Sequence, residues 1–130
     1  MDAIPRHPRA DAAAITGALL LVASLLGVAG AAWAHAFPDH SDPRVGHVVS
    51  APRSVHIWFD GEIEPVFSTI RVEDGDHHRV DSGDGRVDSK DNTLLEVSLP
   101  PLPPGRYLVF WSVVARDGHR TEGRYPFEIK

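Results

Sequence analysis

Two short segments carry residue types that bind metal ions: His35, and Asp117-Gly118-His119 near the end of the chain. His35 directly follows Ala32-Trp33-Ala34, a small-x-small pattern that signal peptidase cleaves. A cut after Ala34 would give the mature protein an N-terminal histidine. The free α-amine and the ring Nδ1 of such a residue can close a six-membered chelate ring on one metal ion, whereas a histidine inside the chain offers only its ring.

Asp117 and His119 are two positions apart, so in an extended segment their side chains point to the same side of the backbone. Gly118 between them lets the chain turn tightly. Together with the amine and ring of His35, this pair offers three nitrogen donors and one carboxylate oxygen. Such donors in a tetragonal arrangement suit Cu(II), which also leads the affinity order of the divalent first-row metals. Asp and Gly are common in turns, so the triplet alone is a weak signal.

Sulfur ligands are missing from most of the chain. There is no Cys, and the single Met is Met1. Thiolate and thioether ligands, which Cu(I) prefers, are therefore absent beyond Ala34. We predict one Cu(II) ion per chain and no Cu(I) site. Without Cys, an exported domain forms no disulfide bond and is held together by packing alone.

The segment before His35 has the three parts of a secretory signal. Its start is basic, residues 12–32 contain no charged side chain, and the small-residue exit follows. We predict that residues 1–34 are a helical signal peptide and that residues 35–130 form a single exported domain, periplasmic or otherwise outside the cytoplasm. The alternative is an uncleaved membrane anchor, because the apolar run approaches the ~20 residues that span a bilayer.

Short segments of alternating apolar and polar residues predict β-strands in the exported part. Arg106–Ala115 is apolar on both faces and is predicted to be a central strand. Other strands are expected at Val45–Val49, Ser54–Phe59, Pro65–Glu73, Thr93–Leu99 and Thr121–Ile129, with a weak edge strand at His77–Val80. No segment has a helical period of useful length. The pattern predicts an all-β domain, an antiparallel β-sandwich of immunoglobulin-like type.

Beyond Ala34 the sequence resembles the CopC family of exported copper-binding proteins. The resemblance rests on the N-terminal His35, Glu62-Ile63-Glu64-Pro65 after the strand ending in Phe59, a proline-rich connector before Gly105–Val114, and Asp117-Gly118-His119. It implies a β-sandwich or barrel with Greek-key topology and a tight Cu(II) site. The ligands that it implies are His35, through two atoms, Asp117 and His119.

Two positions depart from the family pattern. Some members have a Glu near the Cu(II) site, two residues after the Phe of the first long strand, where this chain has Gly61. The carboxylates nearest to that position in sequence are Asp60, Glu62 and Glu64. Other members have a Met-rich loop for Cu(I), where this chain has His77 and His78. The resemblance therefore implies a protein that binds Cu(II) only.

The function we predict is Cu(II) binding without catalysis, in copper homeostasis or resistance. The protein would sequester or carry copper as a monomer and exchange it with a copper-transporting membrane protein or another copper chaperone. Its net charge of −5 argues against nucleic acid as a partner. Two other classes stay open, a copper-dependent redox enzyme with a histidine-brace site and a metal-free structural β-sandwich.

The remaining histidines beyond Ala34 are His40, His47, His56, His77 and His78. His40 and His47 lie close to His35 in sequence and are candidates to approach the copper ion. His77 and His78 are candidates for a second site, although adjacent residues of a strand face opposite ways. His56 alternates with core residues and is expected on the surface of its sheet.

Overall fold

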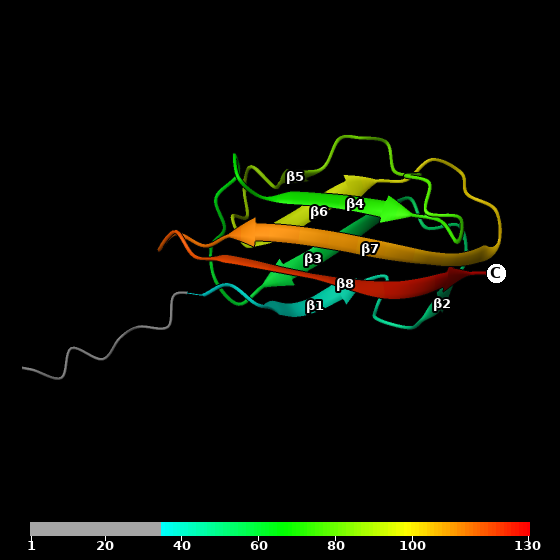
Figure 1. The fold of residues 1–130 in the computed structure, drawn as a ribbon, viewed down its shortest axis with the longest axis horizontal. Coiled ribbons are helices and arrows are strands. Elements are labelled where there is room, and N and C mark those ends of the chain that lie inside the picture. The colour runs from blue at the N-terminus through cyan, green and yellow to red at the C-terminus, as the bar shows by residue number, and fades with distance from the viewer. Residues whose placement is uncertain (1–34) are drawn as a thin grey trace, which may run out of the picture. The chain divides into compact units, whose positions relative to one another are not determined.

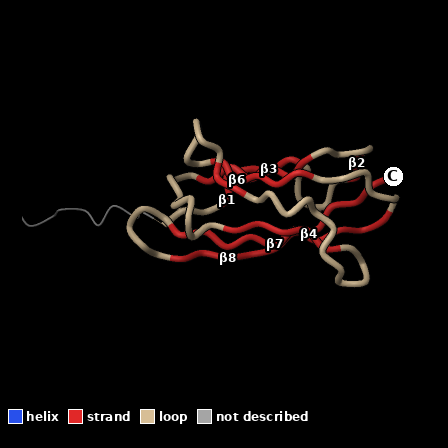
Figure 2. The backbone as a smooth tube through the Cα atoms, turned by 90° about the horizontal axis from the view of Figure 1, so that it is seen from above, coloured by secondary structure: helices blue, strands red, loops and turns tan. Residues whose placement is uncertain are grey.

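The computed structural model describes residues 35–130, and the predicted signal peptide lies outside this range. Within the range the chain forms eight β-strands, arranged as two four-stranded sheets packed face to face (Figures 1 and 2). The described residues contain no helix that is long and apolar enough to cross a bilayer. The β-sandwich predicted from the alternating segments is confirmed.

Each sheet joins strands that are distant in sequence. The first sheet contains, in spatial order, β1 (Pro38–Asp42), β3 (Ser54–Phe59), β6 (Leu94–Ser98) and β5 (Arg86–Val87). The second sheet contains β2 (Val48–Val49), β8 (Arg120–Ile129), β7 (Gly105–Val114) and β4 (Thr69–Glu73). Neighbouring strands are antiparallel except β2 and β8, which pair in parallel. This short pair departs from the antiparallel arrangement that we predicted.

Alternate residues of the long strands point between the sheets and form one core. The buried side chains at its centre include Val55, Ile57, Val72, Leu95, Val97, Val109, Val113 and Phe127. β7 lies between β8 and β4 in the second sheet (Figure 1). Both of its edges are therefore hydrogen-bonded, as predicted from its apolar residues on both faces. Burial of these side chains is the main force that holds a chain without disulfide bonds in this fold.

Trp111 packs on the inner face of the second sheet, where β7 and β8 run side by side. Its indole lies against Gly123, its partner on β8, and meets the ring of Phe59 edge to face with centroids 5.3 Å apart. A Cβ atom on Gly123 would stand 2.6 Å from the indole Cζ2. The absence of a side chain at this position therefore makes room for the ring.

The strand predicted at Pro65–Glu73 begins only at Thr69. The residues before it form a turn, in which the Phe67 N–H donates to the Glu64 carbonyl at 3.3 Å. Alternation of apolar and polar residues continues through this turn, so the sequence pattern alone placed the start of the strand too early.

Two other strand predictions were wrong in extent. Val45–Val49 contributes only its last two residues, as β2. His77–Val80 contributes a single bridge, between Arg79 and Glu73. The polar stretch that follows contains β5, which the sequence did not reveal because a strand of two residues is too short to show alternation.

Candidate metal centre

The hairpin between β7 and β8 carries two of the three predicted ligands. Backbone hydrogen bonds close its turn, from the Gly118 N–H to the Ala115 carbonyl and from the Ala115 N–H to the His119 carbonyl, both 2.9 Å. Gly118 has a φ of 87°, in the left-handed region that residues with a Cβ rarely adopt. The side chains of Asp117 and His119 do lie together, but a turn brings them there and not the extended segment from which we predicted it.

The Asp117 carboxylate contacts His119 twice. Its Oδ1 accepts the backbone N–H of His119 at 2.9 Å, and its Oδ2 lies 2.8 Å from the ring Nδ1. The backbone hydrogen bond does most to lower the pKa of Asp117, and the His119 ring adds to the effect. The carboxylate is therefore ionised at neutral pH. Each of its oxygens keeps a further lone pair, so Asp117 can retain both contacts and still bind a cation.

His35 reaches this turn from the N-terminal end of the domain. Its ring stacks on that of His119, with centroids 4.5 Å apart and planes inclined by 26°. One possible donor atom from each of His35, Asp117 and His119 lies within 4.8 Å of the other two. The fold thus brings together the three residues that the sequence singled out. The α-amine of His35 would add a fourth donor once the peptide bond to Ala34 is cut.

Two residues that the sequence analysis did not assign to the site hold the arm that follows His35. The Thr121 hydroxyl donates to the Ala36 carbonyl at 2.7 Å. On the other side, the Phe37 N–H donates to the Asp60 carboxylate at 2.7 Å, and the Asp60 N–H donates to the Phe37 carbonyl at 2.9 Å. Thr121 and Ala36 are 85 positions apart, and Asp60 and Phe37 are 23 apart. No local sequence signal could therefore have revealed these contacts.

His40 and His56 both stack on Trp58, on the outer face of the first sheet. The ring centroids of His40 and Trp58 are 4.5 Å apart, and those of His56 and Trp58 are 5.5 Å apart. The His56 Nε2 also lies 3.3 Å from the Glu96 carboxylate. His56 therefore lies on the sheet surface, as predicted. His40 was only a candidate to approach that site, and it is not part of the cluster with His35.

His47 lies at the opposite end of the second sheet from the candidate ligands. Its carbonyl accepts the N–H of Glu128 near the end of β8, whereas His119 directly precedes the start of that strand. His119 and Glu128 are nine positions apart, which is roughly 30 Å of extended strand. His47, the other candidate to approach the site, therefore lies far from His35, Asp117 and His119.

His77 and His78 lie in the loop after β4 and do not form a site with one another. His78 instead groups with Asp74 and Asp76, with donor atoms within 4.8 Å of one another. The Asp74 Oδ1 accepts the N–H groups of Asp76 and His78 at 2.9 and 3.0 Å. The hydrogen bond from His78 does most to lower the pKa of Asp74. Such bonds are typical of Asp in turns and account for this cluster without an ion.

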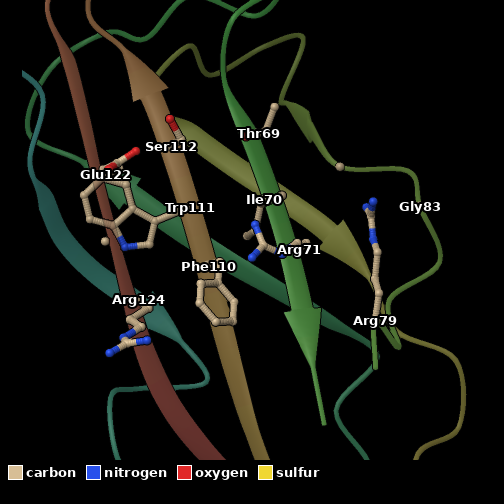
Figure 3. A pocket seen from close by; sticks show the side chains of 12 residues that line it. Thr69, Ile70, Arg71, Arg79, Gly83, Phe110, Trp111, Ser112, Glu122 and Arg124 are labelled. Carbon is tan, nitrogen blue, oxygen red and sulfur yellow. The ribbon is translucent and has the colours of Figure 1, made fainter. Parts of the chain in front are cut away.

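A groove of about 670 Å³ lies on the outer face of β4, β7 and β8 (Figure 3). Phe110 lies at its base, with the Arg71 guanidinium 4.3 Å from the centre of its ring. Arg79 and Arg124 add positive charge to the lining, and Glu122 adds a carboxylate. None of the three clustered donors lines this groove, so it is separate from the candidate metal centre.

Comparisons with known proteins identify the family of this chain. The family model described as CopC domain matches residues 39–130. Protein YobA of Escherichia coli K12 is 33% identical over 100 residues, which cover 75% of this chain and 81% of YobA.

Two solved structures have the same fold. CopC from Methylosinus trichosporium OB3b superimposes with a TM-score of 0.66 and 30% identity, over 74% of this chain and 94% of its own. PcoC from Escherichia coli, a methionine-rich copper resistance protein, superimposes with a TM-score of 0.67 and 26% identity, over 75% of this chain and 100% of its own. The family match covers most of the chain, and the solved structures share its fold. The chain therefore belongs to the CopC family.

Proposed function

We propose that the mature protein binds one Cu(II) ion through His35, Asp117 and His119 and sequesters or carries it outside the cytoplasm. The observation that carries this proposal is the convergence of one donor atom from each of the three residues within 4.8 Å. His35 would contribute its α-amine and its ring, Asp117 an oxygen and His119 a ring nitrogen. Three nitrogens and one carboxylate oxygen suit the tetragonal geometry of Cu(II).

The choice of copper rests on chemistry and on family membership. PcoC, which shares this fold, is a copper resistance protein. PcoC is also methionine-rich, whereas the only Met of this chain is Met1 and it has no Cys. The sulfur donors that favour Cu(I) are therefore missing from residues 35–130, and the nitrogen and oxygen donors favour Cu(II).

The position of the donors favours transfer rather than storage in the interior. The His119 side chain is 63% exposed and that of Asp117 is 24% exposed. A copper-transporting membrane protein or another copper chaperone could reach an ion held there directly. Binding and release by a monomer need no catalytic group, so the proposed function is that of a carrier.

Export and metal binding are coupled in this proposal, because the amine of His35 exists only after the signal peptide is removed. The intact mass of the exported protein tests the first step. A mass that corresponds to a start at His35 is the expected result. A start at Met1, or at any other residue, would remove the amine from the donor set.

The second step is tested by Cu(II) titration of two purified proteins, one that starts at His35 and one that carries an extra Gly before it. The extension keeps every side chain but turns the amine into an amide, which binds metal only after it loses a proton. We expect the extended protein to bind Cu(II) much more weakly and with a changed electron paramagnetic resonance spectrum. The variant His47→Ala, at the far end of the sheet, is the control and should bind normally. Equal affinity and equal spectra for both starts would exclude the amine as a ligand.

A further inference from the structure

We propose that Thr121 and Asp60 form a clamp on the N-terminal arm, Ala36 and Phe37, that positions the amine and ring of His35 for the metal. This inference rests on the proposed function. Thr121 and Asp60 are positioning residues in it and do not touch the ion. The clamp makes the two nitrogens of a chain terminus part of a preformed site.

One side of the clamp comes from the second sheet. The Thr121 Oγ1 donates to the Ala36 carbonyl at 2.7 Å. Thr121 follows His119 by two residues, so a single short segment carries both a candidate ligand and a contact that fixes the arm. The distance from the arm to His119 is thereby set by one hydrogen bond and two residues of β-strand.

The other side comes from the end of the first sheet. Asp60 directly follows β3 and joins Phe37 through two hydrogen bonds, one accepted by its carboxylate at 2.7 Å and one donated by its backbone N–H at 2.9 Å. The arm is thus attached to both sheets within two residues of the predicted terminus. Asp60 is exposed and has no position in the core, which points to a local role in holding the arm.

Ala36 sets a steric condition on the arm. It is completely buried, with 0% of its surface exposed, although it would be only the second residue of the mature protein. Chain termini are ordinarily poorly ordered unless something holds them. A terminus that enters the core at its second residue fixes the direction in which His35 leaves it. A larger residue at this position would push the arm away from the hairpin.

The physical benefit of the clamp is preorganisation. A free terminal histidine must lose the freedom of its backbone and side chain when it chelates a metal, and this loss weakens binding. Hydrogen bonds at Ala36 and Phe37 restrict the arm before the ion arrives. They should therefore favour the bound state and slow the release of Cu(II).

The test uses the mature protein and the variants Thr121→Val, Thr121→Ser and Asp60→Ala. The Val variant keeps the shape of the side chain and removes its hydroxyl, while the Ser variant keeps the hydroxyl. Thr69→Val, at an exposed position of β4, is the matched control. Cu(II) affinity and the rate of Cu(II) loss to excess EDTA are measured for each protein, together with thermal unfolding of the metal-free form.

Thr121→Val and Asp60→Ala should each release Cu(II) about tenfold faster, which is the effect of one lost hydrogen bond. Thr121→Ser and Thr69→Val should behave like the native protein. A second measurement does not depend on copper. The Phe37 amide proton should be protected from hydrogen exchange in the metal-free native protein and should lose this protection in Asp60→Ala. If Asp60→Ala does not fold, Asp60→Asn, which keeps an acceptor oxygen, is used in its place. The comparison of Thr121→Val with Thr121→Ser then tests the clamp.

The outcomes separate the clamp from the proposed function. Tight Cu(II) binding by the native protein, with unchanged release from Thr121→Val and Asp60→Ala and rapid exchange at Phe37, would reject the clamp and leave the copper site intact. Weak Cu(II) binding by the native protein, with or without protection at Phe37, would reject the proposed function. Faster release that is restored by Thr121→Ser, at unchanged metal-free stability, would support the clamp.

Discussion

The Asp117 carboxylate lies 2.8 Å from the Nδ1 of His119. An ionised carboxylate can only accept a hydrogen bond, so Nδ1 carries the proton and the lone pair of His119 is on Nε2. The same carboxylate also accepts the backbone N–H of His119 at 2.9 Å. Asp117 therefore orients the His119 ring in addition to offering its own oxygen to a metal, as carboxylates commonly do for metal-binding histidines.

This relationship predicts an order of effects for substitutions in the turn. His119→Ala removes a nitrogen donor and should weaken Cu(II) binding most, because imidazole is the stronger Cu(II) donor of the two. Asp117→Ala removes an oxygen donor and the contact that orients the ring, and should weaken binding less. Competitive titration of Cu(II) against a chelator of known affinity gives the order. Stronger damage from Asp117→Ala would mean that orientation of His119 matters more than its direct bond to the metal.

The oxidation state of the bound ion is the subject of a second prediction. The mature protein should bind Cu(II) strongly and Cu(I) poorly, because thiolate and thioether groups are missing from residues 35–130. Titration of Cu(I) against a standard Cu(I) chelator under anaerobic conditions measures this directly. If the protein takes Cu(I) from the chelator, the Cu(II)-only interpretation is wrong. His77→Ala and His78→Ala would then show whether the loop after β4 is responsible.

A third prediction separates two pH ranges, one for the fold and one for the metal. Burial would raise the pKa of Asp81, but hydrogen bonds from Arg79 and from the Val72 and Gly83 N–H groups outweigh it and lower the pKa. The pKa is also lowered for Asp74, Asp84, Asp91 and Asp117, mainly by hydrogen bonds to backbone and hydroxyl groups. A carboxyl with a lower pKa in the folded state adds stability above its unfolded pKa, about 4, and loses it as the pH falls further.

As the pH falls, Cu(II) should dissociate at a higher pH than the one at which the protein unfolds. Protons compete with the metal for the imidazole and α-amine nitrogens, because these groups bind a metal only in their deprotonated form. As the pH falls from 8, Cu(II) affinity should therefore weaken while the protein is still folded. Circular dichroism of the metal-free protein and electron paramagnetic resonance of the Cu(II) form, each followed from pH 8 to pH 3, measure the two transitions. Simultaneous loss of copper and structure would show that unfolding alone releases the ion.

A fourth prediction concerns the packing of Trp111. A Cβ on Gly123 would stand 2.6 Å from the indole, so Gly123→Ala must displace the ring or separate β7 from β8. We expect a loss of about 1–3 kcal/mol in the free energy of unfolding, the usual cost of overpacking a core. Gly61→Ala is the matched control, because a Cβ there meets nothing within 4 Å. Urea unfolding followed by tryptophan fluorescence measures both variants, and equal stability of the two would show that the indole moves at little cost.

Much of the fold was already determined by the sequence. Alternation of apolar and polar residues predicted β3 at its observed bounds, and the doubly apolar Arg106–Ala115 predicted the internal strand β7 to within a residue at each end. These signals are local, because which side of a strand faces the core depends on the residues of that strand alone. The same holds for the turn at Gly118, where two residues at fixed spacing present a carboxylate and an imidazole together.

Only the tertiary structure decided which distant groups meet. His47 and His40 are near His35 in sequence, yet one lies at the far end of β8 and the other stacks on Trp58. Thr121 and Asp60 are far from the arm in sequence and hold it by hydrogen bonds. Register and sheet order bring these groups together, and both depend on how two sheets bury a common core. Residue types and local spacing do not reveal such contacts. The candidate donors could therefore be named from the sequence, while the contacts that hold the arm beside them could not.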